Sequence, residues 1–237
     1  MRGGARALLI DLDGVLRRWD AQRDPPPEVP FGLPPGTVSG TAFDPPLLEA
    51  ATTGRITDEE WRRQIVERLA PRYGREAAAG AVAAWSAPLG RVEASVLQLV
   101  RAVRRKAPGS TRSRVERAQR ATRAGAPVCL VTNATTRLER DLDALGLRVE
   151  LDVVINSSRV GARKPDRRIF AAALDALGVP AAAAFFVDDN PGLVDAARAL
   201  GLSAHHFTGT AALAGALQEA GLLPAAEDVV RRGMSPS

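Results

Sequence analysis

The stretch ALLIDLDGVL, residues 7–16, reads as a buried strand that ends in two aspartates and a glycine. Its run of four apolar residues is typical of a strand covered inside a parallel sheet, and we expect this one over residues 7–11. Asp11 and Asp13 stand one residue apart, directly before Gly14. Because Asp-Gly is also a common turn signal, this stretch alone does not show whether the two carboxylates only end a strand or also take part in a reaction.

Beyond residue 127 the chain alternates short apolar runs with helical periods. Strands that alternate with helices in this way are typical of a parallel sheet with helices on both faces. We therefore predict an α/β fold with a doubly wound, Rossmann-like parallel sheet. The predicted strands are PVCLVT (127–132), LDVVIN (151–156), AFFVDD (184–189) and SAHHF (203–207), and the predicted helices are TTRLERDLDALG (135–146), DRRIFAAALDALG (166–178) and PGLVDAARALG (191–201).

A mostly helical stretch interrupts this alternation after the first strand. The segment TDEEWRRQIVERL starts at Thr57 and has Glu60 three residues on, a capping-box pattern. A Pro- and Gly-rich run over 24–46 precedes the helices and is expected to be irregular. The predicted division is an α/β core over 1–16 and 94–237, a small inserted helical domain over 17–93, and an extra Arg-rich insertion over 107–120 within the core. For that insertion, an added surface helix, a partner-binding arm and a mobile loop stay open.

Composition is that of a globular protein, with 46% hydrophobic and 25% charged residues among 237. No apolar run approaches the roughly 18–20 residues of a membrane span. The N-terminus shows no signal-peptide pattern, so we expect no membrane partner and a cytoplasmic location. Cys129, the single cysteine, lies within the apolar run PVCLV and is predicted to be a buried residue rather than a nucleophile.

The net charge of +5 is concentrated in one segment. Residues 101–125 hold nine Lys or Arg and one acid, so +5 overall less +8 here leaves −3 for the rest. A nucleic-acid-binding face would spread positive charge over more of the fold, which makes nucleic acid an unlikely partner. We expect a small-molecule ligand instead, bound by a monomer or a homodimer.

Polar side chains stand where predicted strands or helices end or begin. These are Asp11 and Asp13, Thr132 and Asn133, Lys164, and Asp188 and Asp189. Ligands of open α/β sheets bind beyond the carboxyl ends of the strands, so we expect these groups to meet at one rim. Four carboxylates there would repel unless a cation lay among them, and an all-oxygen site suits Mg²⁺. A carboxylate beside Mg²⁺ can attack phosphorus, while a second carboxyl protonates the leaving alcohol.

Four short motifs, in this order, resemble those of the haloacid dehalogenase-like hydrolase superfamily. They are DLDGV (11–15), VTN (131–133), KPD (164–166) and VDDN (187–190). A single D-x-D is a weak signal, but the four motifs match the family in order and spacing over nearly the whole chain. The helical insert resembles the family's C1-type cap, which closes over the site and sets substrate choice.

The resemblance implies a catalytic role for each matched residue. Asp11 is implied as the nucleophile and Asp13 as the general acid/base. Thr132 and Asn133 would hold the phosphoryl group, and Lys164 would stabilise the phosphoaspartate.

The same resemblance implies a Mg²⁺ site. Asp11, the main-chain carbonyl of Asp13, and Asp188 would be its ligands, with Asp189 in support. The sequence departs from the family pattern at Leu193, where many relatives carry Asn.

The sequence thus predicts a Mg²⁺-dependent phosphatase that hydrolyses a small phosphorylated metabolite through an aspartyl-phosphate. Because dehalogenases of the superfamily lack an acid at the position of Asp13, the resemblance argues against dehalogenation. A phosphotransferase or phosphomutase, and a non-catalytic phospho-acceptor or interaction protein, remain as alternatives. Among nearby residues, Arg17 and Arg18 are expected on the solvated surface rather than facing an anionic substrate. Trp61 and Trp85 are expected to pack inside the cap rather than to contact substrate.

Overall fold

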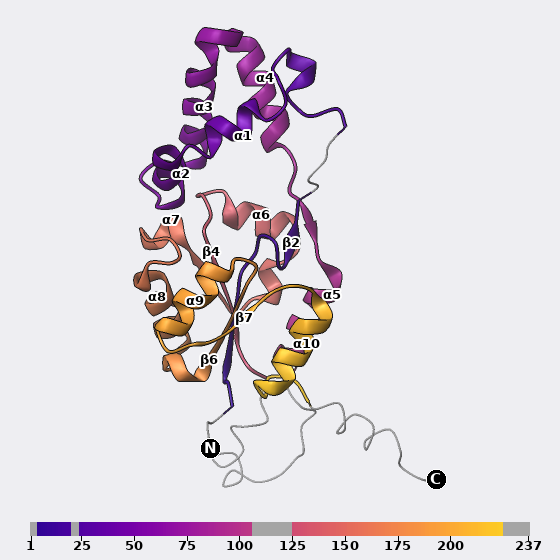
Figure 1. Cartoon of the computed structure of the whole chain (residues 1–237), viewed down its shortest axis with the longest axis vertical. Coiled ribbons are helices and arrows are strands. Elements are labelled where there is room, and N and C mark those ends of the chain that lie inside the picture. The colour runs from indigo at the N-terminus through magenta and orange to yellow at the C-terminus, as the bar shows by residue number, and fades with distance from the viewer. Residues whose placement is uncertain (1–3, 20–23, 106–124, 225–237) are drawn as a thin grey trace, which may run out of the picture.

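The computed structural model describes residues 4–19, 24–105 and 125–224 (Figure 1). The Arg-rich insertion predicted over 107–120 lies outside these described residues. Within them, no helix has the length and apolar character needed to cross a membrane.

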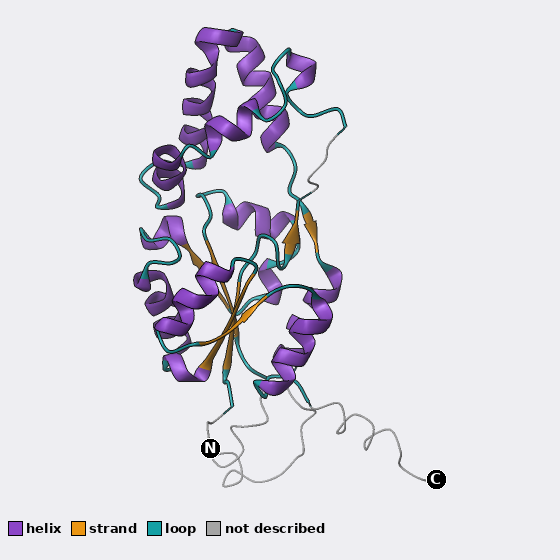
Figure 2. Ribbon diagram, in the orientation of Figure 1, coloured by secondary structure: helices purple, strands orange, loops and turns teal. Residues whose placement is uncertain are grey.

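A five-stranded parallel sheet forms the centre of the core, in the order β5-β4-β1-β6-β7 (Figure 2). The strands are β1 (Ala7–Ile10), β4 (Val128–Thr132), β5 (Val153–Asn156), β6 (Ala184–Asp188) and β7 (Ser203–His206). Every residue of β1, β4 and β6 is buried, as the continuous apolar runs indicate. The predicted doubly wound α/β fold is confirmed, with β1 one residue shorter than expected.

Helices cover both faces of the sheet because side chains alternate along each strand. Leu8 and Ile10 belong to one apolar cluster, which includes residues of α5, α6 and α10. Ala7 and Leu9 belong to the other, with residues of α8 and α9. The core helices are α5 (Ala94–Arg104), α6 (Leu138–Ala144), α7 (Ser157–Val160), α8 (Arg167–Leu177), α9 (Pro191–Ala199) and α10 (Thr210–Glu219), with 3-10 turns η3 (Arg148–Glu150) and η4 (Ala181–Ala183).

A helical lobe lies over the carboxyl ends of the strands (Figure 1). It consists of η1 (Val29–Phe31), α1 (Thr37–Ala42), α2 (Pro45–Thr52), α3 (Asp58–Tyr73) and α4 (Arg75–Ser86), and it has an apolar core of its own. The side chain of Thr57 accepts the N–H of Glu60, as the capping pattern predicts. The expectation of irregular structure over 24–46 is wrong at η1 and α1. Burial of Val38 and Ala42 against the lobe outweighs the weak helix propensity of TVSGTA.

Two short strands join the lobe to the core. β2 (Arg17–Arg18) leads into the lobe and β3 (Arg91–Val92) leads back, and they pair antiparallel. The two segments that connect the lobe to the core therefore run side by side.

Candidate active site

Three carboxylates gather beyond the ends of β1 and β6. Because Ile10 pairs with Val187, the next residues, Asp11 and Asp188, become neighbours at the rim, and the Asp11 N–H donates to the Val187 carbonyl at 3.0 Å. Asp11, Asp188 and Asp189 each offer a carboxylate oxygen within 4.8 Å of the others. The parallel register thus builds a cluster of three acidic groups.

A buried lysine neutralises part of this charge. Lys164 Nζ lies 2.7 Å from Asp11 Oδ1 and 2.7 Å from Asp188 Oδ2, and the residue is only 2% exposed. Burial raises the pKa of Asp11 to about 6, since it outweighs the lowering effect of Lys164. Burial opposes the charge on Lys164, but the charges of Asp11 and Asp188 keep the pKa of its ammonium above the ordinary value. Burial, and then the charge of Asp188, raises the pKa of Asp189.

Asn133 holds the backbone of Lys164 in place. Its Nδ2 donates to the Lys164 carbonyl at 3.0 Å, and its Oδ1 accepts the Lys164 N–H at 2.7 Å. Both polar atoms of the Asn133 side chain bind Lys164, and the expected contact of Asn133 with a phosphoryl group stays a prediction. Through these two hydrogen bonds the Asn133 side chain positions the backbone of Lys164.

A cavity of about 510 Å³ opens over the carboxylate cluster. Thr132, the last residue of β4, lines it together with Lys164 and the three acids. Gly14 also lines it, with φ +84°, and a Cβ there would lie 1.9 Å from Asp189 Oδ2. The turn after β1 therefore needs glycine both for its backbone conformation and for its close approach to Asp189. Leu193 lines the same cavity, where the family pattern has Asn.

The carboxylate of Asp13 is held apart from this cluster. Arg17 donates to it from Nε at 2.6 Å and from Nη2 at 3.0 Å, and Trp19 Nε1 donates at 2.8 Å. Three carboxylates meet at the rim, rather than the four expected. Asp13, Trp19 and Asn133 line the cavity over the cluster and also a second cavity, of about 490 Å³, under the helical lobe. Asp13 thus stands between the two.

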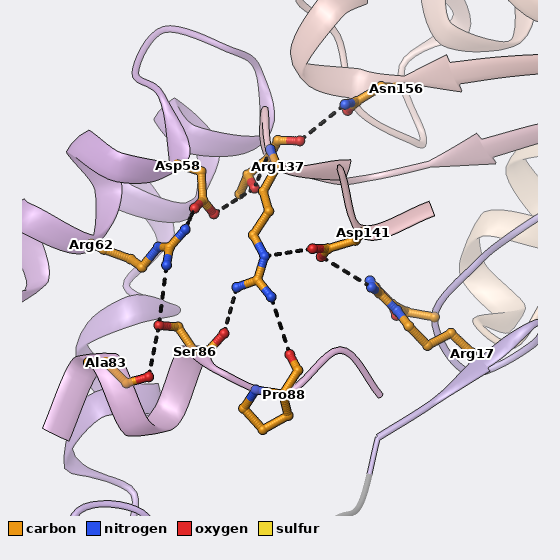
Figure 3. Close-up of polar contacts among 11 residues, drawn as sticks. Arg17, Asp58, Arg62, Ala83, Ser86, Pro88, Arg137, Asp141 and Asn156 are labelled. Atoms are coloured by element: carbon orange, nitrogen blue, oxygen red, sulfur yellow. Dashed lines mark hydrogen bonds and ion pairs between the residues drawn. The ribbon is translucent and has the colours of Figure 1, made fainter. Parts of the chain in front are cut away.

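Arg17 is buried, so the expectation of a solvated position is wrong for it. Its Nη1 lies 3.5 Å from Asp141 Oδ2, and Arg137 Nε donates to the other oxygen of Asp141 at 2.7 Å (Figure 3). Arg137 in turn donates to the carbonyls of Ser86, at 2.5 Å, and Pro88, at 3.3 Å. A chain of charged groups therefore connects Asp13 to the segment that returns from the lobe. Sequence reasoning missed this chain, although the i,i+4 spacing of Arg137 and Asp141 was a signal for one of its pairs.

A second set of contacts ties α3 to the core. The Asp58 N–H donates to Thr136 Oγ1 at 2.9 Å, and Thr135 Oγ1 donates to Asp58 Oδ1 at 2.8 Å. Arg62 pairs with the other oxygen of Asp58 (Figure 3). Ser157 Oγ donates to the carbonyl of Thr52 at 2.5 Å. The lobe is therefore held to the core by residues of the loop after β4 and by the first residue of α7.

Comparison with known proteins gives one family. The model of the family described as haloacid dehalogenase-like hydrolase matches residues 5–201. The chain is 44% identical over 66 residues to haloacid dehalogenase-like hydrolase domain-containing protein 3 of Mus musculus, covering 28% of this chain and 26% of that protein. It is 35% identical over 89 residues to a phosphatase of Mycobacterium tuberculosis, covering 37% and 41%. It is 42% identical over 72 residues to a phosphoserine phosphatase of Thermus thermophilus, covering 30% and 29%. The matches thus span less than half of each relative.

Solved structures show the same fold over most of the chain. A HAD family enzyme from Bacteroides thetaiotaomicron, in complex with magnesium and inorganic phosphate, has a TM-score of 0.61 at 22% identity, covering 85% of this chain and 93% of that one. The L-2-haloacid dehalogenase of Xanthobacter autotrophicus, with chloropropionic acid covalently bound, has a TM-score of 0.55 at 18% identity, covering 93% and 85%.

Proposed function

The chain belongs to the haloacid dehalogenase-like hydrolase family, and we propose that within it the protein is a Mg²⁺-dependent phosphatase acting on a small phosphorylated metabolite. The observation that carries this proposal is the placement of Asp13. Asp13 lies at the boundary of two cavities. One contains Asp11, the nucleophile, and the buried Lys164, and the other can hold the alcohol side of an ester. The similarity to phosphatases of Mycobacterium tuberculosis and Thermus thermophilus supports the choice of reaction.

The carboxylate cluster fits a divalent metal ion. Its donors are all oxygen, they come from Asp11, Asp188 and Asp189, and they lie close enough to share one ion. We assign Asp11, Asp188 and the main-chain carbonyl of Asp13 as ligands, with Asp189 in support. Bound there, Mg²⁺ would offset the negative charge of the phosphoryl group and of the carboxylates around it. The magnesium and phosphate bound in the similar Bacteroides thetaiotaomicron enzyme support the same pair of ligands here.

In the first half of the reaction, a carboxylate oxygen of Asp11 attacks phosphorus. The bond between phosphorus and the alcohol oxygen breaks, and Asp13 gives its proton to that oxygen. Lys164 stabilises the negative charge on the phosphoryl oxygens, and Thr132 donates a hydrogen bond to one of them. The products are a neutral alcohol and an aspartyl-phosphate on Asp11.

In the second half, the ionised Asp13 takes a proton from water as the water oxygen attacks phosphorus. The bond from phosphorus to the Asp11 oxygen breaks, which releases inorganic phosphate and restores the carboxylate. Asp13 is then protonated for the next cycle. We propose that the helical lobe acts as a cap, which admits the ester and limits the access of other acceptors.

The presence of Asp13 also separates phosphate transfer from dehalogenation. A departing alkoxide needs a proton, whereas a departing halide ion is stable without one. Because Arg17 and Trp19 fix an acid at the boundary of the two cavities, the site is equipped for an alcohol leaving group.

The test is the hydrolysis of p-nitrophenyl phosphate with and without Mg²⁺, by wild type, Asp11→Asn and Asp195→Asn. Asp195 is an exposed acid on α9 that pairs with Arg198, so its variant controls for the loss of a carboxylate. We expect Mg²⁺-dependent turnover by wild type and Asp195→Asn, and none by Asp11→Asn. Turnover that survives Asp11→Asn would contradict the mechanism. Preferred transfer to an added sugar hydroxyl, rather than to water, would favour the phosphotransferase alternative.

A further inference from the structure

The cavity under the helical lobe has an aromatic wall. All three tryptophans of the chain, Trp19, Trp61 and Trp85, line it, together with Phe43. The ring centroids of Trp61 and Trp85 are 5.8 Å apart, and those of Phe43 and Trp85 are 5.9 Å apart, both edge to face. Trp61 and Trp85 therefore do pack within the lobe, as expected, but they also form part of this wall. Phe43 and Trp19 are 56% and 45% exposed, so a ligand in the cavity can cover apolar surface that is now in contact with water.

The charged residues of the wall are already paired with one another. Asp13 pairs with Arg17, and Asp141 with Arg17 and Arg137. Asp58 pairs with Arg62, which does not itself line the cavity (Figure 3). Three carboxyl groups therefore meet three guanidinium groups, so each charged side chain of the wall already has a partner. A charged group on the ligand would have to displace one of these partly buried pairs, whereas an uncharged ring would leave them intact.

We propose that the alcohol side of the substrate is uncharged and carries a flat aromatic or heteroaromatic ring, which lies against Trp61, Trp85 and Phe43. This proposal rests on the phosphatase function above, because Asp13 at the boundary of the cavities fixes which side the alcohol occupies. A cavity of about 490 Å³ has room for such a group. A small charged alcohol, such as serine or glycolate, would leave the aromatic wall uncovered.

The first test compares phosphate esters that differ only on the alcohol side. These are 2-phenylethyl phosphate, the same ester with a carboxylate on the ring, and ethyl phosphate. With Mg²⁺, kcat/KM for the uncharged aromatic ester should exceed that for each of the others by about tenfold, the effect of roughly one well-packed ring. Equal or better turnover of the carboxylated ester or of ethyl phosphate would overturn the proposal, and the phosphatase function would still stand.

Two variants test whether the preference for the aromatic ester arises at this wall. Phe43→Ala removes an exposed ring from the wall and should abolish most of the preference for the aromatic ester. Phe31→Ala removes a ring of the same lobe, also partly exposed, which does not line the cavity, and it should leave the preference unchanged. An unchanged preference in Phe43→Ala, or equal losses in both variants, would overturn the proposal.

A binding experiment keeps the proposal testable if no ester is hydrolysed. Every tryptophan of the chain lines this cavity, and Trp61 and Trp85 do not line the cavity over the carboxylates, so the intrinsic fluorescence reports mainly on the contents of the cavity under the lobe. With Asp11→Asn protein, 2-phenylethanol should change the fluorescence saturably, and the alcohol with a ring carboxylate should bind at least about tenfold more weakly. A fluorescence that does not respond to 2-phenylethanol, or tighter binding of the carboxylated alcohol, would overturn the proposal independently of catalysis.

Discussion

Replacing Lys164 by Met should strongly destabilise the metal-free protein. The ammonium contacts two carboxylates at 2.7 Å each, and the residue is 2% exposed. Met fills most of the space of the aliphatic stem, so the loss is mainly one of charge. Removing one partner of a buried ion pair costs about 3–5 kcal/mol, because a charge stays buried without compensation. In a chain of this size each kcal/mol shifts the melting temperature by about 2–4 °C, so we expect a fall of roughly 6–20 °C.

Guanidinium unfolding in EDTA measures this free energy, with Arg198→Met as the control. Arg198 forms an exposed pair with Asp195 and an exposed hydrogen bond to the Ala204 carbonyl, and losing both should change the free energy of unfolding by about 1 kcal/mol at most. Adding Asp11→Asn to Lys164→Met should recover part of the loss, because one of the two uncompensated carboxylates is then gone. Mg²⁺ should also stabilise Lys164→Met, since it supplies positive charge at the same place. A loss no larger than that of the control, or a double variant whose losses simply add, would refute the electrostatic reasoning.

Three further outcomes follow from the same site. Arg17→Met should reduce kcat/KM for an alkyl phosphate at least about tenfold more than for p-nitrophenyl phosphate, because Arg17 no longer holds the Asp13 carboxyl in position and only the poorer leaving group depends on proton transfer from it. Arg55→Met, which removes an exposed pair with Glu49 outside both cavities, should not change this ratio, and equal losses on both substrates for Arg17→Met would contradict the role. Mg²⁺ affinity should fall as the pH falls through about 6, the raised pKa of the buried Asp11, because a proton bound below that pKa competes with the metal ion. Titration calorimetry one unit above and one unit below that pKa checks this, and equal affinities would contradict it. Burial raises the pKa of Cys129 to about 12, so a thiol reagent should label it only after unfolding, and rapid labelling of the native protein would argue against its place in β4.

The sequence predicts the parallel sheet and the rim of the site well, for a geometric reason. Parallel strands deliver the residues after them to one edge, so Asp11, Thr132 and Asp188 come together once the strands are recognised. Continuous apolar runs make those strands easy to recognise. The pairing of Lys164 with two carboxylates then follows from the need to balance buried charge.

Features that depend on the direction of a side chain or on tertiary packing could not be predicted in this way. Asp13 turns toward Arg17 and Trp19 because of where β2 carries them, and no periodicity encodes that direction. The helix α1 (Thr37–Ala42) forms in a run full of Pro and Gly, because burial of Val38 and Ala42 compensates for poor local propensity. The burial of Arg17 could not be predicted either, because its two carboxylate partners, Asp13 and Asp141, come from different elements.

The proposed mechanism requires the phosphoryl group to pass through a covalent bond to Asp11. Acid quenching of the protein during turnover, followed by borohydride reduction and peptide mass spectrometry, converts an aspartyl-phosphate to homoserine and identifies the position. We expect homoserine at Asp11 in wild type, in an amount that depends on Mg²⁺ and substrate, and none in Asp11→Asn. Turnover with an unmodified Asp11, or with the reduced residue at another aspartate, would contradict it.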